Sequence, residues 1–145
     1  MHIIHPFISK GNHSLISKRS IQLLAKTPFV LASAGIYYFS SLPQPPFVMT
    51  SFQWQDKILH LCAYLFYGIA IAIGIHPHQS FSLKKRIIII VTIGFVYALS
   101  DEFHQSFVPG RTSEIGDLIA DWIGVSLAAL LYGFMINRKE SRYSK

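Results

Sequence analysis

The chain of 145 residues is long enough for one domain of ordinary size, and hydrophobic residues make up 51% of it. Charged residues make up only 14%, where a soluble domain usually carries about 25%, so the composition excludes a disordered chain and disfavours a water-soluble one. The formal net charge of +6 would suit nucleic acid, but in so apolar a chain the placement of the charges matters more than their sum. No nucleic-acid partner is expected.

Four apolar stretches follow one another along the chain and predict an all-α integral membrane bundle of four transmembrane helices. A membrane core about 30 Å thick needs about 20 helical residues. The first stretch covers residues 28–42, and we expect Thr27 as its N-cap with Pro28 in the first helical position. The second stretch covers 58–75, and the fourth, 115–136, is long enough to span unaided.

The third stretch, residues 87–99, is too short by itself. Its 13 residues cover about 20 Å at about 1.5 Å per residue. It crosses a membrane only if the helix continues through His104, which draws Asp101 and Glu102 into the outer edge of the membrane. Residues 108–112 contain proline and glycine and should form a loop after the helix.

Basic residues predict the direction of the spans, because cytoplasmic loops collect Lys and Arg. Only Lys57 and Arg111 of the 13 basic residues fall outside three groups, which precede span one, separate spans two and three, and follow span four. These groups are Lys10, Lys18, Arg19 and Lys26; Lys84, Lys85 and Arg86; and Arg138, Lys139, Arg142 and Lys145. We therefore expect a multi-pass protein of the plasma (inner) membrane with both termini in the cytoplasm. A basic cytoplasmic segment, 1–26, precedes the membrane domain, 27–137, and a basic cytoplasmic tail, 138–145, follows it.

Polar residues gather at the expected outer ends of spans two to four. Asp56, His60 and Tyr64 are spaced i, i+4, i+8, so they share one helix face, and Asp56 can hold the tautomer of His60. In the third span, Asp101 and Gln105 are also four residues apart, and Gln105 follows Glu102 by three.

Arg111 follows this group in a sharp turn, and its planar guanidinium suits bidentate pairing with carboxylates or capture of a phosphate or carboxylate ligand. Asp117 and Asp121 share a face of the fourth span, and a bare carboxylate at Asp121 would cost about 2.5–3.5 kcal/mol on insertion scales. We expect Arg111 within ion-pair reach of Glu102, Asp117 or Asp121, with Arg111 a better anchor than Lys57. We expect His60 to face Glu102 across the helix interface.

Three motifs, in this order, resemble those of the VanZ-like family of membrane proteins, which is named for a protein tied to teicoplanin resistance. They are Asp56-Lys57-x-x-His60-x-x-x-Tyr64, Asp101-Glu102-x-x-Gln105-x-Phe107-x-Pro109-Gly110-Arg111 and Asp117-x-x-x-Asp121-x-x-Gly124. The family usually has asparagine where this chain has Asp121. The resemblance implies a plasma-membrane protein linked to the cell envelope, and to antibiotic resistance, but it supplies no reaction.

The first functional hypothesis is a non-enzymatic site at the outer ends of helices two to four that binds a lipid head group, a cell-wall precursor or a glycopeptide-like ligand. The expected partners are membrane lipids and an envelope lipid precursor, and no cofactor is expected. The site would comprise Asp56, Lys57, His60, Tyr64, Asp101, Glu102, Gln105, Arg111, Asp117 and Asp121.

The alternative is a membrane enzyme acting on a lipid-linked envelope substrate, with His60 as general base and Glu102 as acid. A metal site built from Asp56, His60, Glu102 and Asp117 ranks lower, because no H-E-x-x-H spacing is present. Proton or ion transfer ranks last, because nothing comparable lines the inner half of any span.

Overall fold

The computed structural model describes residues 17–43, 54–78 and 80–143, and every regular element in these ranges is helical. The all-α class is therefore confirmed for the part of the chain described. The helices are α1 (Lys18–Leu24), α2 (Thr27–Ser40), α3 (Gln55–Ile75), α4 (Leu83–Gln105) and α5 (Ile115–Tyr143). Residues 1–16 of the basic N-terminal segment, the connection beyond Pro43 and the terminal Lys145 lie outside the described residues.

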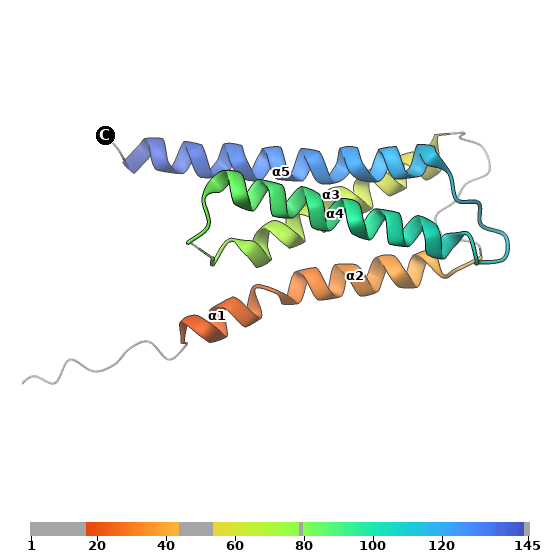
Figure 1. The fold of residues 1–145 in the computed structure, drawn as a ribbon, viewed down its shortest axis with the longest axis horizontal. Coiled ribbons are helices and arrows are strands. Elements are labelled where there is room, and N and C mark those ends of the chain that lie inside the picture. Colours follow the sequence, from red (N-terminus) through yellow and green to blue (C-terminus); the bar gives the residue numbers. More distant parts are fainter. Residues whose placement is uncertain (1–16, 44–53, 79, 144–145) are drawn as a thin grey trace, which may run out of the picture.

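Three of these helices, α3, α4 and α5, are long and apolar enough to cross a membrane. The expected first span corresponds to α2, whose 14 residues cover about 21 Å at about 1.5 Å per residue, less than a membrane core. The seven-residue α1 precedes it and extends along nearly the same line (Figure 1). The four-span bundle and its orientation therefore stay predictions, and three candidate spans are established.

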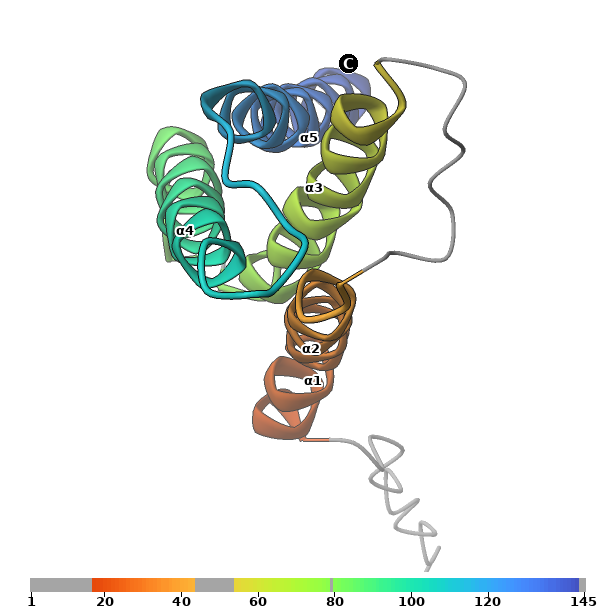
Figure 2. The same cartoon turned by 90° about the vertical axis from the view of Figure 1, so that its right-hand side faces the viewer.

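Helices α3, α4 and α5 lie side by side and form the centre of the molecule (Figures 1 and 2). The contact between α3 and α5 is the most extensive, and α5 also packs along α4. Helix α2 lies against α3 on the side away from α5, as the end-on view in Figure 2 shows. This arrangement leaves α2 as the outer wall of one side of the bundle.

Small residues allow the three central helices to approach closely. Val125 of α5 is fully buried, and its side chain occupies the space that a side chain at Gly94 of α4 would need, while a Cβ at Gly68 of α3 would meet the Cβ of Ala128 and the Val125 backbone. One residue earlier, a Cβ at Gly124 would collide with the backbone carbonyl of Leu61. Small residues of this kind are how membrane helices come into backbone contact. The close approach of α3 and α5 brings their polar side chains within hydrogen-bonding distance.

The predicted extension of the third span is confirmed. Helix α4 begins after Ser82, whose side chain accepts a hydrogen bond from the Lys85 amide, and it continues to Gln105. Asp101 and Glu102 are therefore helical and buried, and residues 106–114 form the connection to α5. Large apolar side chains remain exposed along α3, α4 and α5, which suits a lipid environment.

The expected start of the first span is wrong by one residue. Lys26, and not Thr27, is the N-cap of α2. Lys26 has φ −83° and ψ −16°, close to helical values, because the turn that joins α1 to α2 stays nearly helical. Pro28 still falls in the first turn, where its missing N–H costs nothing.

Candidate functional site

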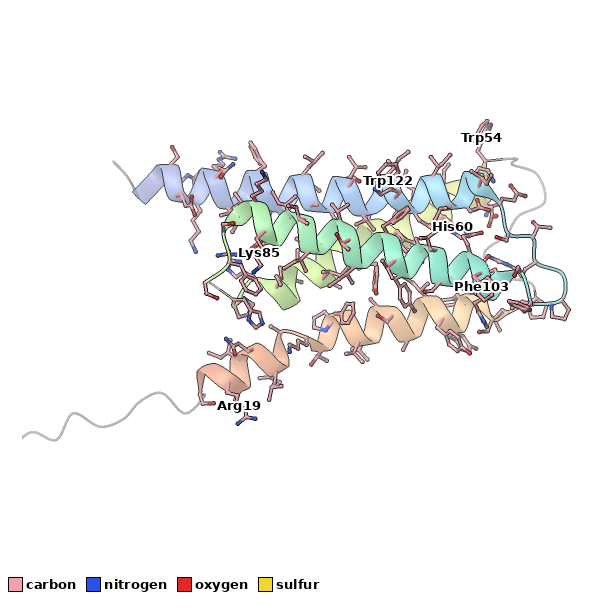
Figure 3. The ribbon with its side chains drawn as sticks, in the orientation of Figure 1. Arg19, Trp54, His60, Lys85, Phe103 and Trp122 are labelled. Atoms are coloured by element: carbon pink, nitrogen blue, oxygen red, sulfur yellow. The ribbon has the colours of Figure 1, made fainter. Side chains whose placement is uncertain are left out.

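The polar residues predicted from the sequence gather at one end of the central bundle. In Figure 3, His60 lies between the helices toward the end that carries Trp54 and Phe103, and Lys85 lies at the other end. The first turns of α3 and α5 meet the last turn of α4 there, because α4 runs antiparallel to both. Among the candidate residues, His60, Tyr64, Asp101, Glu102, Gln105, Asp117 and Asp121 are buried.

Lys57, in the first turn of α3, bridges two acidic residues at the start of α5. Its Nζ lies 2.8 Å from Oε2 of Glu114 and 3.0 Å from Oδ1 of Asp117. Asp117 is only 1% exposed, so this ammonium is the charge that balances a buried carboxylate. At the exposed Glu114, the hydrogen bond from Lys57 lowers the pKa of the carboxyl below its ordinary value.

His60 connects the three central helices. Its Nδ1 lies 2.9 Å from Oδ1 of Asp121 on α5 and 3.9 Å from Oε1 of Glu102 on α4. The predicted approach of His60 to Glu102 is therefore confirmed. The residue that holds the imidazole is Asp121, and not Asp56 as predicted, because the close approach of α3 and α5 at Gly124 brings Asp121 within hydrogen-bonding distance of His60.

Glu102 is held through only one of its two carboxylate oxygens. Oε2 accepts hydrogen bonds from the Ser113 hydroxyl at 3.0 Å and from the backbone N–H of Glu114 at 3.1 Å. Within the described residues, Oε1 of Glu102 and Oδ2 of Asp121 are buried and have no hydrogen-bond partner. Unsatisfied acceptors of this kind are costly, so they mark a place where a ligand or ion would be favourable.

A second chain of hydrogen bonds leads from α3 to the loop after α4. The Tyr64 hydroxyl donates to Oδ2 of Asp101 at 3.2 Å, and Nε2 of Gln105 donates to the same oxygen at 3.3 Å. The guanidinium of Arg111 donates to Oε1 of Gln105. Nε2 of Gln105 also donates to the Ser40 hydroxyl at 3.5 Å, so these hydrogen bonds extend to α2.

The predicted ion pair of Arg111 is wrong. Arg111 has no carboxylate within ion-pair distance among the described residues, and its partner is the neutral Gln105. The turn at 108–110, in which Gly110 has φ +83°, directs Arg111 toward the last turn of α4. Asp117 and Asp121 point to α3 instead, where Lys57 and His60 meet them. Lys57 therefore has the anchoring role expected of Arg111.

A cavity of about 350 Å³ opens between α2 and α3 beside these polar groups. One part of its wall is polar and is formed by Asp56, His60, Tyr64, Asp101, Gln105 and Arg111. The rest is mainly apolar and includes Ala32, Gly35, Ile36 and Phe39 of α2, with Ala63 and Phe66 of α3. A cavity of this size and composition is typical of small-molecule and lipid sites.

The four residues considered for a metal, Asp56, His60, Glu102 and Asp117, do not form one set: the described residues hold two sets that share His60, and the second includes Asp121, which was not predicted as a metal ligand. One set is Asp56, His60 and Asp117, and the other is His60, Glu102 and Asp121. The sequence analysis did not identify α2 as a wall of the cavity, or the Ser113 hydroxyl and the Glu114 backbone N–H as partners of Glu102. The one available signal for the last two was the acidic Glu114 directly before an apolar span.

These features define the class of protein: an α-helical membrane-type protein whose candidate spans enclose a buried polar cluster beside a partly apolar cavity. The family model described as VanZ/LLP1 matches residues 6–136, and the chain therefore belongs to this family. No curated protein and no solved structure matches the chain.

Proposed function

We propose that the chain is a multi-pass protein of the plasma membrane that binds a phosphate-bearing amphiphile in the cavity between α2 and α3. The polar end of the cavity takes the head group at the outer side of the membrane, and the apolar part takes hydrocarbon chain. An envelope lipid, either a glycerophospholipid or a polyprenyl phosphate, has this chemistry, and a role in the cell envelope or in glycopeptide resistance would follow from holding it.

The observation that carries the proposal is the division of the cavity wall into a polar and an apolar part. Six polar or ionisable side chains line one part, and small or apolar side chains of α2 and α3 line most of the remainder. A fully polar ligand, such as a glycopeptide, would leave the apolar part unused. A membrane amphiphile matches both parts, and the candidate spans around the cavity place it where such molecules are abundant.

Arg111 indicates the charge of the head group. It lines the cavity, and among the described residues its hydrogen-bond partner is the neutral amide of Gln105. Its positive charge is thus available to a phosphate, and the planar guanidinium can make two parallel hydrogen bonds to phosphate oxygens.

The carboxylates of the cavity indicate how the head group is oriented. Asp56 and Asp101 also line the polar part and would repel a phosphate placed beside them. They can accept hydrogen bonds from hydroxyl or amine groups farther along a head group. We therefore expect the phosphate beside Arg111, with hydroxyl or amine groups turned toward Asp101.

The enzyme alternative has less support. His60 lines the cavity, but Glu102, the acid in that hypothesis, is not among the lining residues. Glu102 faces His60 from α4, on the side of α5. A ligand in the cavity would therefore meet only one member of the proposed acid–base pair, so binding without chemistry is the better proposal.

The test is native mass spectrometry of the full chain released from its own membranes in a mild detergent. We expect one bound lipid, and its mass distinguishes a glycerophospholipid from a polyprenyl phosphate. Gly35→Leu should fill the apolar part, because a Cβ at Gly35 meets nothing within 4 Å. The matched control is Ala34→Leu, which adds bulk at the neighbouring exposed position.

A second pair of variants tests the head group. Arg111→Ala should lose most of the bound lipid, and Arg111→Lys should retain part of it, because a lysine keeps the charge without the fork. Arg138→Ala removes an exposed arginine far from the cavity and should bind as the unaltered chain does. Equal lipid retention in Gly35→Leu and Ala34→Leu, both folded, would refute the proposal.

A further inference from the structure

One buried residue from each central helix meets at a single point beside the cavity. His60 of α3, Glu102 of α4 and Asp121 of α5 each offer a ligand atom, and these atoms all lie within 4.8 Å of one another. All three residues are at least nine-tenths buried, with exposed fractions of 8%, 5% and 0%. Such a convergence of one imidazole and two carboxylates is a donor set for divalent transition-metal ions.

The unpartnered carboxylate oxygens are an independent indication of a ligand. Oε1 of Glu102 faces Nδ1 of His60 at 3.9 Å, beyond hydrogen-bonding distance, and it has no partner among the described residues. Oδ2 of Asp121 is also buried without a partner. A buried acceptor left in this state loses the full free energy of its hydration, which a bound cation would replace.

The distances suit a metal ion. Atoms bound at about 2.1 Å to one ion lie roughly 3.0–3.4 Å apart in octahedral or tetrahedral geometry. The two separations from Nδ1 of His60, 2.9 Å to Oδ1 of Asp121 and 3.9 Å to Oε1 of Glu102, bracket this range. Small side-chain rotations would therefore be enough to seat an ion between the three residues.

The surroundings hold one of the ligands in place. The second oxygen of Glu102 is fixed by the Ser113 hydroxyl and the Glu114 backbone N–H. Hydrogen bonds to the far side of a ligand orient it toward a metal and are a regular feature of such sites. These two bonds come from the loop before α5, so that loop determines the direction of Oε1.

The balance of charge also favours a cation. Two buried carboxylates with a neutral imidazole carry a charge of −2, and protonation of His60 would still leave −1. A divalent ion neutralises the set. The second set consists of Asp56, His60 and Asp117. It already has a positive charge beside it, because the Lys57 ammonium lies 3.0 Å from Asp117. The site therefore lies at Glu102 and Asp121.

We propose that His60, Glu102 and Asp121 form a binding site for a divalent transition-metal ion of the Zn²⁺ or Mn²⁺ class. Three protein ligands leave at least one coordination position for water or another donor. The ion would join α3, α4 and α5 at the polar end of the bundle. The proposal does not depend on whether the cavity holds a lipid.

The experiment measures Zn²⁺ binding to the full chain in mild detergent after treatment with a chelator, by equilibrium dialysis and elemental analysis. We expect one equivalent of Zn²⁺ and a rise in the thermal unfolding temperature of the loaded protein. Glu102→Gln and Asp121→Asn should each weaken binding about tenfold or more, since even second-shell losses cost 10–100-fold. Glu140→Gln, at an exposed position in the last turns of α5, is the matched control outside the site and should bind normally.

Several results would overturn the proposal. One is the absence of stoichiometric Zn²⁺ or Mn²⁺ binding to the unaltered chain. Another is binding that Asp56→Asn or Asp117→Asn abolishes and Glu102→Gln leaves intact, which would place the ion in the other set. If the variants do not fold, X-ray absorption of the Zn²⁺-loaded chain still tests the ligands, because a spectrum with sulfur, or without one imidazole and oxygen ligands, would overturn the proposal.

Discussion

Replacing Lys57 by methionine should destabilise the chain more than any change at Arg111, which reverses the expectation drawn from the sequence. Lys57 donates to Glu114 and to the buried Asp117. Methionine keeps much of the aliphatic stem, which passes close to Gly116, and removes the ammonium with its charge and its two hydrogen bonds. The substitution therefore leaves the Asp117 carboxylate, whose side chain is 2% exposed, without its cation.

The magnitude follows from the burial of the two partners. Removing one member of a buried pair costs about 3–5 kcal/mol, while an exposed pair contributes about 0–1 kcal/mol. The side chain of Lys57 is 26% exposed, so we place Lys57→Met near the lower end of the buried range, at about 3 kcal/mol. Glu114 is half exposed, and Glu114→Gln should cost about 1 kcal/mol or less.

Unfolding in mixed micelles of a mild detergent and sodium dodecyl sulfate, followed by circular dichroism, measures these differences. Arg111→Ala is the comparison, and it should cost about 1 kcal/mol because it removes a hydrogen bond to the neutral Gln105. Lys57→Met combined with Asp117→Asn should recover most of the loss, since position 117 then carries no carboxylate that needs the Lys57 ammonium. An Arg111→Ala loss larger than that of Lys57→Met would refute this assignment of the anchor.

Three further predictions concern orientation, packing and pH. A reporter active only outside the cytoplasm should be active when fused after Pro109 and silent after Lys84, and activity after Lys84 would contradict the topology. Gly124→Ala should cost about 1–3 kcal/mol or more in the same unfolding assay, because its Cβ would meet the Leu61 backbone, and an unchanged stability would show that α3 and α5 are farther apart. Because the pKa of Glu114 is lowered, its pair with Lys57 stabilises the fold above the ordinary value of 4.5 and loses this effect as pH falls through the lowered value, so Glu114→Gln should flatten the acid limb of the stability–pH profile.

The helices could be predicted from the sequence because apolar length is a local property of the chain. The extension of α4 through Asp101 and Glu102 followed from the 13-residue shortfall of residues 87–99, since a helix that must cross a membrane cannot stop early. The gathering of the polar residues at one end followed in the same way, from their equal depth on antiparallel helices.

The partners within the cluster could not be predicted, because they depend on how each helix is rotated about its axis. From the sequence, either Asp56 or Asp121 could form a hydrogen bond with His60. The close approach of α3 to α5 at Gly124 makes Asp121 the partner. Arg111 was assigned to the carboxylates by charge alone. Its position depends on the turn at Gly110, whose direction the sequence does not show.

The cavity was also beyond the sequence, because it forms between α2 and α3, and the way these helices face each other depends on contacts between residues far apart in the chain. The hydrogen bonds of Ser33 to Tyr67 and of Tyr97 to the Ser33 carbonyl fix α2 against the bundle. Neither tyrosine stands out in the sequence as a partner of α2. The apolar part of the cavity therefore depends on contacts that only the folded chain shows.

The most direct test of lipid binding in the cavity is photo-crosslinking with a phospholipid that carries a diazirine on its acyl chain, followed by peptide mapping of the full chain in bilayers. If the cavity holds the lipid, we expect adducts concentrated on the cavity walls, at Gly35 and Ile36 of α2 and at Ala63 and Phe66 of α3, and their loss in Gly35→Leu. Adducts spread over the exposed face of α5 at Leu130 and Phe134, with no enrichment on the cavity walls and no response to Gly35→Leu, would contradict it.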